Sequence, residues 1–220
     1  MRADDLKLTI FIVDDDLAVT DSMKADLQQI GTPIEIYSGA ERFLESWGGP
    51  RPGCVLLDVR MEGISGLELQ KVLVKHHSYL PVIITSGHAS IQMSVDAMKR
   101  GATDFLEKPY SPDVLREVVR DAIEQAAKKW IGWQERTQFE SKRANLSPRE
   151  REVYCLLLRG LENKQIAQLL GISPSTVEKH RLAVVKKMQA DNLIQLLSQK
   201  FEATGTLEDL DAVDSVNDNA

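Results

Sequence analysis

The sequence CVLLDVRMEGISG, residues 54–66, decides the fold. Its apolar run, residues 54–57, ends at Asp58 and is followed by a loop that contains glycine. A short continuous apolar run of this kind is typical of a strand buried on both faces of a parallel sheet. Ser65 then begins a pattern of helical spacing that reaches Lys75. The stretch therefore predicts a strand, a loop and a helix, with a carboxylate at the carboxyl end of the strand.

The same alternation fills the first 125 residues of the chain. Further strands are predicted at residues 8–13, 34–37, 82–85 and 104–106, and further helices at 18–30, 40–46 and 90–100 and from Ser111 onward. Buried strands that alternate with helices form parallel sheets covered on both faces. The pattern predicts an α/β domain with a doubly wound (βα)₅ parallel sheet.

Polar side chains follow four of the predicted strands: Asp14 and Asp15, Asp58, Ser86, and Lys108. In an open parallel sheet these carboxyl ends meet at one edge. Clustered carboxylates repel one another and need a cation, and oxygen ligands suit Mg²⁺. We interpret the set as a site for attaching phosphate to a carboxylate, with a nucleophile, a metal, a lysine and a hydroxyl. Taken alone, the acidic run at residues 14–16 is explained equally well as surface acids at the N-terminus of a helix. The four strand ends together favour the phosphate site.

Four stretches within residues 7–125 carry a resemblance to a known family: IFIVDDD, CVLLDVRMEGISG, PVIITSGHAS and GATDFLEKPY. The segment resembles the receiver domains of two-component response regulators. The resemblance implies that Asp58 accepts phosphate from a sensor histidine kinase and that Ser86 is the switch hydroxyl. It implies a Mg²⁺ site made by Asp14, Asp15, Asp58 and the backbone carbonyl of Arg60, with Asp15 favoured as a direct ligand. Phe105 matches the rotating aromatic residue, and Lys108-Pro109 matches a Lys-Pro pair that usually has a cis bond.

Glu62 departs from the family pattern, which usually has proline at this position. We expect a looser loop here, with an added negative charge that slows phosphotransfer or metal binding without abolishing either.

Charge divides the chain into segments. Residues 1–125 carry a net charge of −7, residues 142–201 carry +6 and residues 202–220 carry −6. A basic segment between acidic ones indicates a polyanionic partner for that segment. We predict a receiver domain at 1–125, a helical linker at 126–143, a separate basic helical domain at 144–201 and a disordered acidic tail at 202–220.

The basic segment contains a helix-turn-helix pattern. Residues 164–170 have helical spacing, residues 171–173 form a turn, and a second helix is predicted over 176–188, capped by Ser173 or Ser175. A helix of this width fits the major groove of DNA. A helical hairpin with a basic exposed face would give the same charge pattern.

Three stretches within residues 144–200 decide between these interpretations: LSPREREV, GLENKQIAQLLGIS and STVEKHR. They resemble the LuxR/FixJ-type DNA-binding domain, an all-α four-helix domain. The resemblance implies base-facing positions at Glu178, Lys179 and Leu182, contacts with the DNA backbone at Lys164, Thr176, Arg181 and Lys186, and a structural or phosphate-facing His180. A helix at 193–201 would supply a dimer contact.

Together the two resemblances imply a transcription factor that is phosphorylated on Asp58, dimerises and binds promoter DNA. The implied partners are a histidine kinase, double-stranded DNA, a second copy of the chain and RNA polymerase. Enzymatic activity would be limited to self-catalysed phosphotransfer and autodephosphorylation. No apolar run approaches the roughly 18 residues of a membrane span, so we expect no membrane partner. The separated Cys54 and Cys155 favour free thiols in a reducing cytoplasm.

Two alternatives remain open. The first is a phosphorylation-independent regulator whose receiver only dimerises, which Mg²⁺-dependent labelling of Asp58 by acetyl phosphate would distinguish. The second is an α/β hydrolase of the aspartyl-phosphate type. Arg60 stands where such an enzyme has a second aspartate, and the helix-turn-helix pattern also argues against it.

Overall fold

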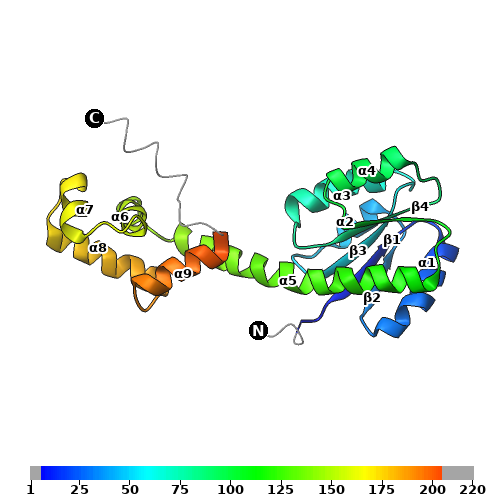
Figure 1. The fold of residues 1–220 in the computed structure, drawn as a ribbon, viewed down its shortest axis with the longest axis horizontal. Helices are drawn as coiled ribbons and strands as arrows, with labels where there is room; N and C mark the ends of the chain where they lie inside the picture. Colours follow the sequence, from blue (N-terminus) through cyan, green and yellow to red (C-terminus); the bar gives the residue numbers. More distant parts are fainter. Residues whose placement is uncertain (1–5, 205–220) are drawn as a thin grey trace. The chain divides into compact units, whose positions relative to one another are not determined.

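The computed structural model describes residues 6–204, and the chain divides into two compact units, Met1–Ile131 and Gly132–Ala220 (Figure 1). The first unit is an α/β domain and the second is helical, so the predicted fold class is confirmed. The unit boundary lies within the predicted linker, residues 126–143.

The first unit is built on a five-stranded parallel sheet with the order β2-β1-β3-β4-β5. Its strands are β1 (Thr9–Val13), β2 (Ile34–Tyr37), β3 (Gly53–Asp58), β4 (Val82–Ser86) and β5 (Asp104–Glu107). β1 has β2 on one side and β3 on the other, and the later strands follow beyond β3. The strand order therefore reverses between β1 and β3. Ligands of open α/β sheets bind outside the carboxyl ends of the strands at such a point.

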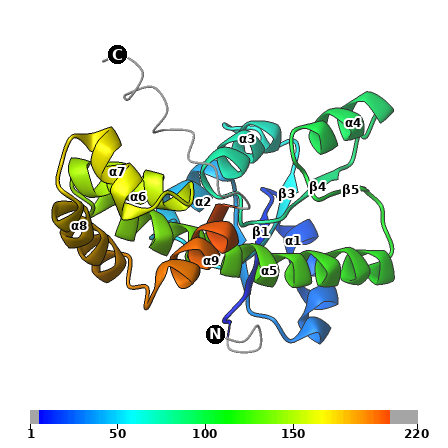
Figure 2. The ribbon, with the colours of Figure 1, turned by 60° about the vertical axis from the view of Figure 1, so that its left-hand side comes forward.

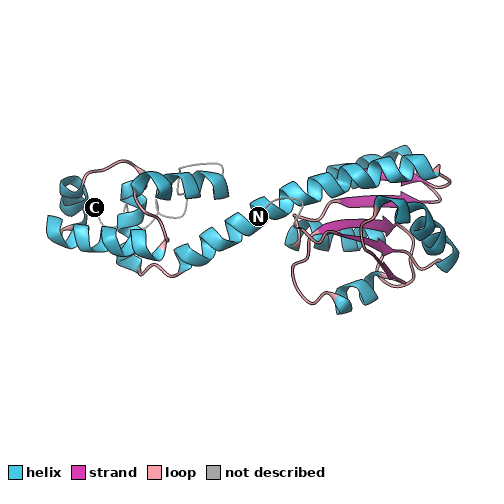
Figure 3. Cartoon of the chain, turned by 90° about the horizontal axis from the view of Figure 1, so that it is seen from below, coloured by secondary structure: helices cyan, strands magenta, loops and turns pink. Residues whose placement is uncertain are grey.

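Helices cover both faces of this sheet (Figure 3). They are α1 (Leu17–Leu27), followed by the 3₁₀ turn η2 (Gln28–Ile30), α2 (Ala40–Ser46), α3 (Gly66–His76), α4 (Ile91–Lys99) and α5 (Pro112–Ala144). Successive strand side chains point to opposite faces. Ile10 and Ile12 pack with the buried residues of α1 and α5, whereas Phe11 contacts Phe43 of α2.

Side-chain caps set several helix boundaries one residue inside the predicted ones. Ser65 and Ser90, predicted as first helical residues, are N-caps. The Ser65 hydroxyl and backbone N–H both engage Glu68, and the Ser90 hydroxyl accepts from Met93 N at 3.1 Å. These caps satisfy backbone donors that the first turn leaves without partners.

Aromatic rings form a continuous chain of contacts through the first unit. It runs from Tyr37 through Phe43 and Trp47 to His77 and Tyr79, and it ends at Trp130 of α5. Tyr79 and Trp130 are both buried, with ring centroids 4.9 Å apart. The chain therefore fixes α5 within this unit to the segment that precedes β4.

The second unit contains α6 (Pro148–Leu158), α7 (Asn163–Leu170), α8 (Pro174–Lys187) and α9 (Leu193–Thr204), visible in Figure 2. Ser147 and Ser173 cap α6 and α8, which decides between the two predicted caps of α8 because Ser175 lies within the helix. Val177 and Val184 of α8 and its C-cap residue Met188 are fully buried. The predicted acidic tail starts at residue 202, yet residues 202–204 belong to α9, and 205–220 lie outside the described residues.

Within residues 6–204, no helix has the length and apolar character that crossing a membrane requires.

Candidate functional site

The carboxyl ends of β1, β3 and β5 bring three predicted site residues into direct contact. Lys108 Nζ lies 2.7 Å from Asp14 Oδ2 and 2.7 Å from Asp58 Oδ1. The pairs are separated by 94 and 50 positions in the sequence. One ammonium group thus bridges two carboxylates that only the sheet topology brings together.

Burial disfavours the charged forms of the side chains in this cluster. Asp14 is 2% exposed and Asp58 is 7% exposed. Burial raises the pKa of Asp14, and its hydrogen bonds with Lys108 and with the N–H of Asp16 only partly oppose that effect. Burial acts to lower the pKa of Lys108, but its bonds to Asp14 and Asp58 outweigh this and the pKa is raised. The site therefore holds two carboxylates near a single fixed cation, which favours further positive charge.

The backbone around Asp58 fixes the position of its carboxylate. Arg60 donates its N–H to Asp58 Oδ2 at 2.6 Å. Gly66, the first residue of α3, lies so close that a Cβ atom would meet the carbonyl oxygen of Asp58 at 1.9 Å. Any side chain at position 66 would push this segment away from β3.

Asp15 is placed by the loop that follows β3. Its side chain is exposed, and Oδ2 accepts a hydrogen bond of 3.0 Å from the backbone N–H of Glu62. This hydrogen bond is made at the position where the family usually has proline, which has no N–H to donate. Two positions on, Ile64 donates its N–H to Glu41 Oε1 of α2 at 2.8 Å. Sequence analysis missed Glu41, because no local signal links residues 23 positions apart.

Ser86 and Phe105 lie on the last two strands. Ser86 is 1% exposed, and its hydroxyl accepts from the N–H of His88 at 3.2 Å. Lys108 donates its backbone N–H to the carbonyl oxygen of Ser86 at 2.8 Å, so the two strand ends are directly joined. Phe105 is half-buried, and the Lys108–Pro109 bond is cis.

The donor chemistry of this site fits Mg²⁺. Among residues 6–204, no three His, Cys, Asp or Glu side chains stand close enough to enclose a metal ion. A full cage is not required, because Mg²⁺ keeps several waters and is held by one or two carboxylates. Asp14 and Asp58 provide hard oxygen donors, and their charge exceeds that of Lys108. We therefore regard the pair, with Asp15 beside it, as suited to the ion.

The second unit presents the predicted DNA-contact residues along α7 and α8. Lys164, Lys179, Leu182 and Lys186 are exposed, whereas Thr176, Glu178, His180 and Arg181 are half-buried. Leu182 is 62% exposed despite its apolar side chain. Exposed basic side chains with an apolar one between them suit a surface that contacts phosphates and base edges.

The side chain of Glu178 is held by other residues of the motif, which the sequence did not indicate. Asn163, the first residue of α7, donates a hydrogen bond to Glu178 Oε2, and Arg181 Nη1 lies 3.8 Å from the same oxygen. Sequence analysis missed Asn163, which joins the two helices of the motif. A carboxylate held in this way has a fixed orientation before any DNA is bound.

An ion pair between an exposed lysine and a buried glutamate also supports this motif. Lys187 Nζ of α8 lies 2.6 Å from Glu150 Oε2 of α6. Glu150 also closes the capping box of Ser147. The hydrogen bond from Lys187 is the main reason that the pKa of Glu150 is lowered. The pair fixes α8 against the first helix of the domain.

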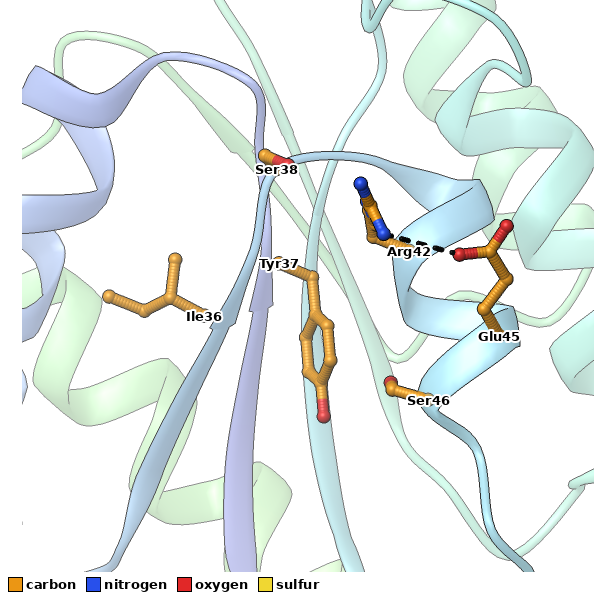
Figure 4. A pocket seen from close by; sticks show the side chains of 6 residues that line it. All are labelled: Ile36, Tyr37, Ser38, Arg42, Glu45 and Ser46. Carbon is orange, nitrogen blue, oxygen red and sulfur yellow. Dashed lines mark ion pairs between the residues drawn. The ribbon is translucent and has the colours of Figure 1, made fainter.

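A shallow recess of about 460 Å³ lies between β2 and α2 (Figure 4). Arg42 and Glu45 on its helical side form an ion pair of 3.6 Å. None of the predicted site residues lines this recess.

Family models match both units. Residues 10–120 match the response regulator receiver domain, and residues 144–199 match the bacterial regulatory proteins of the luxR family.

Individual proteins match over most of the chain. The transcriptional regulatory protein FixJ of Bradyrhizobium diazoefficiens is 40% identical over 91% of this chain and 97% of its own length. The response regulator protein TodT of Pseudomonas putida is 36% identical over 90% and 88%. Among solved structures, the response regulator StyR has a TM-score of 0.70 at 35% identity, covering 87% of this chain and 97% of its own. Full-length FixJ from B. japonicum has a TM-score of 0.53 at 39% identity, covering 91% and 99%.

Proposed function

The chain belongs to the response-regulator transcription factors that join a receiver domain to a LuxR-type DNA-binding domain, and we propose that phosphorylation of Asp58 controls its binding to DNA. The bridge from Lys108 to Asp14 and Asp58 is the observation that carries the proposal. The proposed partners are a sensor histidine kinase, promoter DNA, a second copy of the chain and RNA polymerase, and the proposed location is the cytoplasm.

Phosphotransfer begins with Asp58 as the nucleophile. Its carboxylate oxygen forms a bond to phosphorus while the bond from phosphorus to the nitrogen of the donor histidine breaks. Lys108 lies 2.7 Å from Asp58 Oδ1 and supplies positive charge where the phosphoryl oxygens arrive. Positive charge placed in advance of the reaction stabilises the charge that develops in the transition state.

Asp14, Asp15, Asp58 and the backbone carbonyl of Arg60 would hold Mg²⁺, which when bound offsets the charge of the acids and the phosphoryl group. The residues of the chain then orient the nucleophile. The N–H of Arg60 occupies Asp58 Oδ2 at 2.6 Å, which leaves Oδ1 to face Lys108.

The phosphoryl group would then act on Ser86 and Phe105. The Ser86 hydroxyl, which accepts from His88 N, can rotate to donate to a phosphoryl oxygen. Phe105 turns inward as Ser86 moves. This rearrangement alters the face formed by α4, β5 and the start of α5, which becomes the surface on which two copies associate.

Dimerisation raises DNA affinity without adding base contacts. Two α8 helices would enter successive major grooves roughly 34 Å apart. Ile194 and Phe201 of α9 are 76% and 58% exposed and provide an apolar contact between two DNA-binding units. Two weak half-sites then act together, because binding at one raises the effective concentration at the other.

The test compares the full chain with and without beryllofluoride and Mg²⁺, using gel filtration and a DNA-binding assay. Wild type should become dimeric and bind DNA more tightly only with both additions. Asp58→Asn should remain monomeric, whereas Asp21→Asn, a change of an exposed acid on α1, should respond like wild type. An Asp58→Asn variant that dimerises and binds DNA normally under a phosphodonor would contradict the proposal.

A further inference from the structure

The loop after β3 places three alternate backbone N–H groups on three different carboxylates. Arg60 donates to Asp58 at 2.6 Å, Glu62 to Asp15 at 3.0 Å, and Ile64 to Glu41 at 2.8 Å. The acids come from β3, the segment after β1, and α2. The middle bond joins residues 47 positions apart.

We propose that the backbone N–H of Glu62 is a positioning group, which fixes Oδ2 of Asp15 so that the carboxylate presents its other oxygen to the cation. The inference rests on the proposed function, since it concerns the same Mg²⁺ site. Glu62 acts through Asp15 and contacts neither the cation nor the phosphoryl group.

Asp15 has the greatest need of such a partner among the three acids of the site. Asp14 and Asp58 are buried and are held by Lys108, but Asp15 is exposed. An exposed side chain must lose rotamer freedom when it becomes a ligand. A hydrogen bond that already fixes one oxygen reduces this entropic cost, and removing such orienting partners typically weakens metal binding 10–100-fold.

The flanking residues hold the Glu62 N–H in place independently of any ion. Ile64, two positions on, is bound to Glu41 of α2. Between them, Gly63 has a φ of +80°, and a Cβ atom there would lie 2.3 Å from Glu41 Oε1. The positive φ therefore favours glycine at position 63, and the loop has hydrogen bonds on both sides of the bond to Asp15.

The first experiment needs no metal. Amide hydrogen exchange of full-length wild type should show slow exchange at Glu62 although its side chain is exposed. Asp15→Ala should accelerate exchange at Glu62 and leave the Ile64 amide unchanged, because that amide is bound to Glu41. Exchange at Glu62 that does not respond to Asp15→Ala would overturn the inference.

The second experiment titrates the full-length variants with MgCl₂ by calorimetry. Glu62→Ala keeps the N–H and removes the side-chain charge, so any change in its Mg²⁺ binding reports the charge alone. Replacing the amide at position 62 with an ester removes the N–H and keeps the side chain, so it should weaken Mg²⁺ binding about tenfold.

The outcomes separate this inference from the proposed function. Equal Mg²⁺ affinity in wild type and the ester variant would overturn the positioning role and leave Asp58 phosphorylation intact. Failure of wild type to bind Mg²⁺ would overturn the proposed metal site together with the positioning role.

Discussion

Lys108 donates a hydrogen bond of 2.7 Å to Asp58, the last residue of β3, from a position just beyond β5. The same ammonium group contacts Asp14. Removing it leaves two buried carboxylates without their cation, and breaking a buried ion pair from one side is strongly destabilising.

Lys108→Met should therefore lower the free energy of unfolding of the first unit by about 3 kcal/mol at pH 7. Urea denaturation followed by circular dichroism measures the change. Lys99→Met is the matched control, because Lys99 is exposed at the end of α4. An equal effect of the two substitutions would show that Lys108 has no special electrostatic role.

Asp14→Asn should have the opposite effect. Burial raises the pKa of Asp14 above its unfolded value near 3.8, so ionising it costs stability. That cost is absent below pH 3.8 and grows as the pH rises through the folded pKa. Removing the charge should stabilise the first unit by on the order of 1 kcal/mol at pH 7 and change little at pH 3. Denaturation of Asp14→Asn and of Asp21→Asn at both pH values tests this, since only the former should gain stability at pH 7.

Gly66→Ala should destabilise the first unit by about 1–3 kcal/mol, the usual cost of overpacking. The added Cβ would meet the carbonyl oxygen of Asp58 at 1.9 Å, which is backbone and cannot rotate away. Gly132→Ala is the control, because nothing lies within 4 Å of a Cβ atom there and the site is within α5. The control should stabilise its helix by about 0.5–1 kcal/mol. Thermal denaturation that shifts both variants in the same direction would contradict the steric argument.

Lys187→Met should weaken the second unit in a pH-dependent way. Lys187 holds the pKa of Glu150 below its usual 4.5, so the stability this gives is present above pH 4.5 and is lost as the pH falls through the folded value. Lys187 is partly exposed, which limits the loss at pH 7 to about 1 kcal/mol. Lys186→Met, at an exposed neighbour, provides the comparison in denaturation at pH 7 and at low pH. A loss from Lys187→Met that is unchanged at low pH would exclude the ion pair as its cause.

Lys179→Ala and Lys186→Ala should affect DNA binding in different ways. If Lys179 reads a base edge, its loss costs about 1–3 kcal/mol on the preferred sequence and less on others. Lys186, as a phosphate contact, should weaken binding equally on all sequences and reduce the salt slope by about one. Titrations of both variants on matched and scrambled DNA at several salt concentrations give these values. A uniform loss from Lys179→Ala would reassign it to the phosphate backbone.

Much of the first unit follows from local sequence. Apolar runs and the residues that end them predict the strands and place Asp14, Asp58 and Lys108 at one edge of the sheet. Buried strands and charged strand ends are easy to tell apart in the sequence, because the strands of a parallel sheet are covered on both faces and form nearly continuous apolar runs.

Contacts across large separations were not predictable in this way. The bonds from Ile64 to Glu41 and from Asn163 to Glu178 depend on how loops and helices meet. A single sequence offers no periodicity for such pairs. Likewise, the extension of α9 to Thr204 involves Ala203, which is buried in the domain core, although this segment has the composition of a polar tail.

The aromatic chain that ends at Tyr79 and Trp130 has a consequence for how this receiver tolerates change. Trp47 and Tyr79 precede β3 and β4, whereas the reactive acids follow the opposite ends of the strands. Crowded acids make a fold less stable, and surplus packing elsewhere can compensate for them. We therefore expect substitutions among these acids to be tolerated without unfolding, because the aromatic contacts of Trp47, Tyr79 and Trp130 stabilise the domain at the other end of the strands.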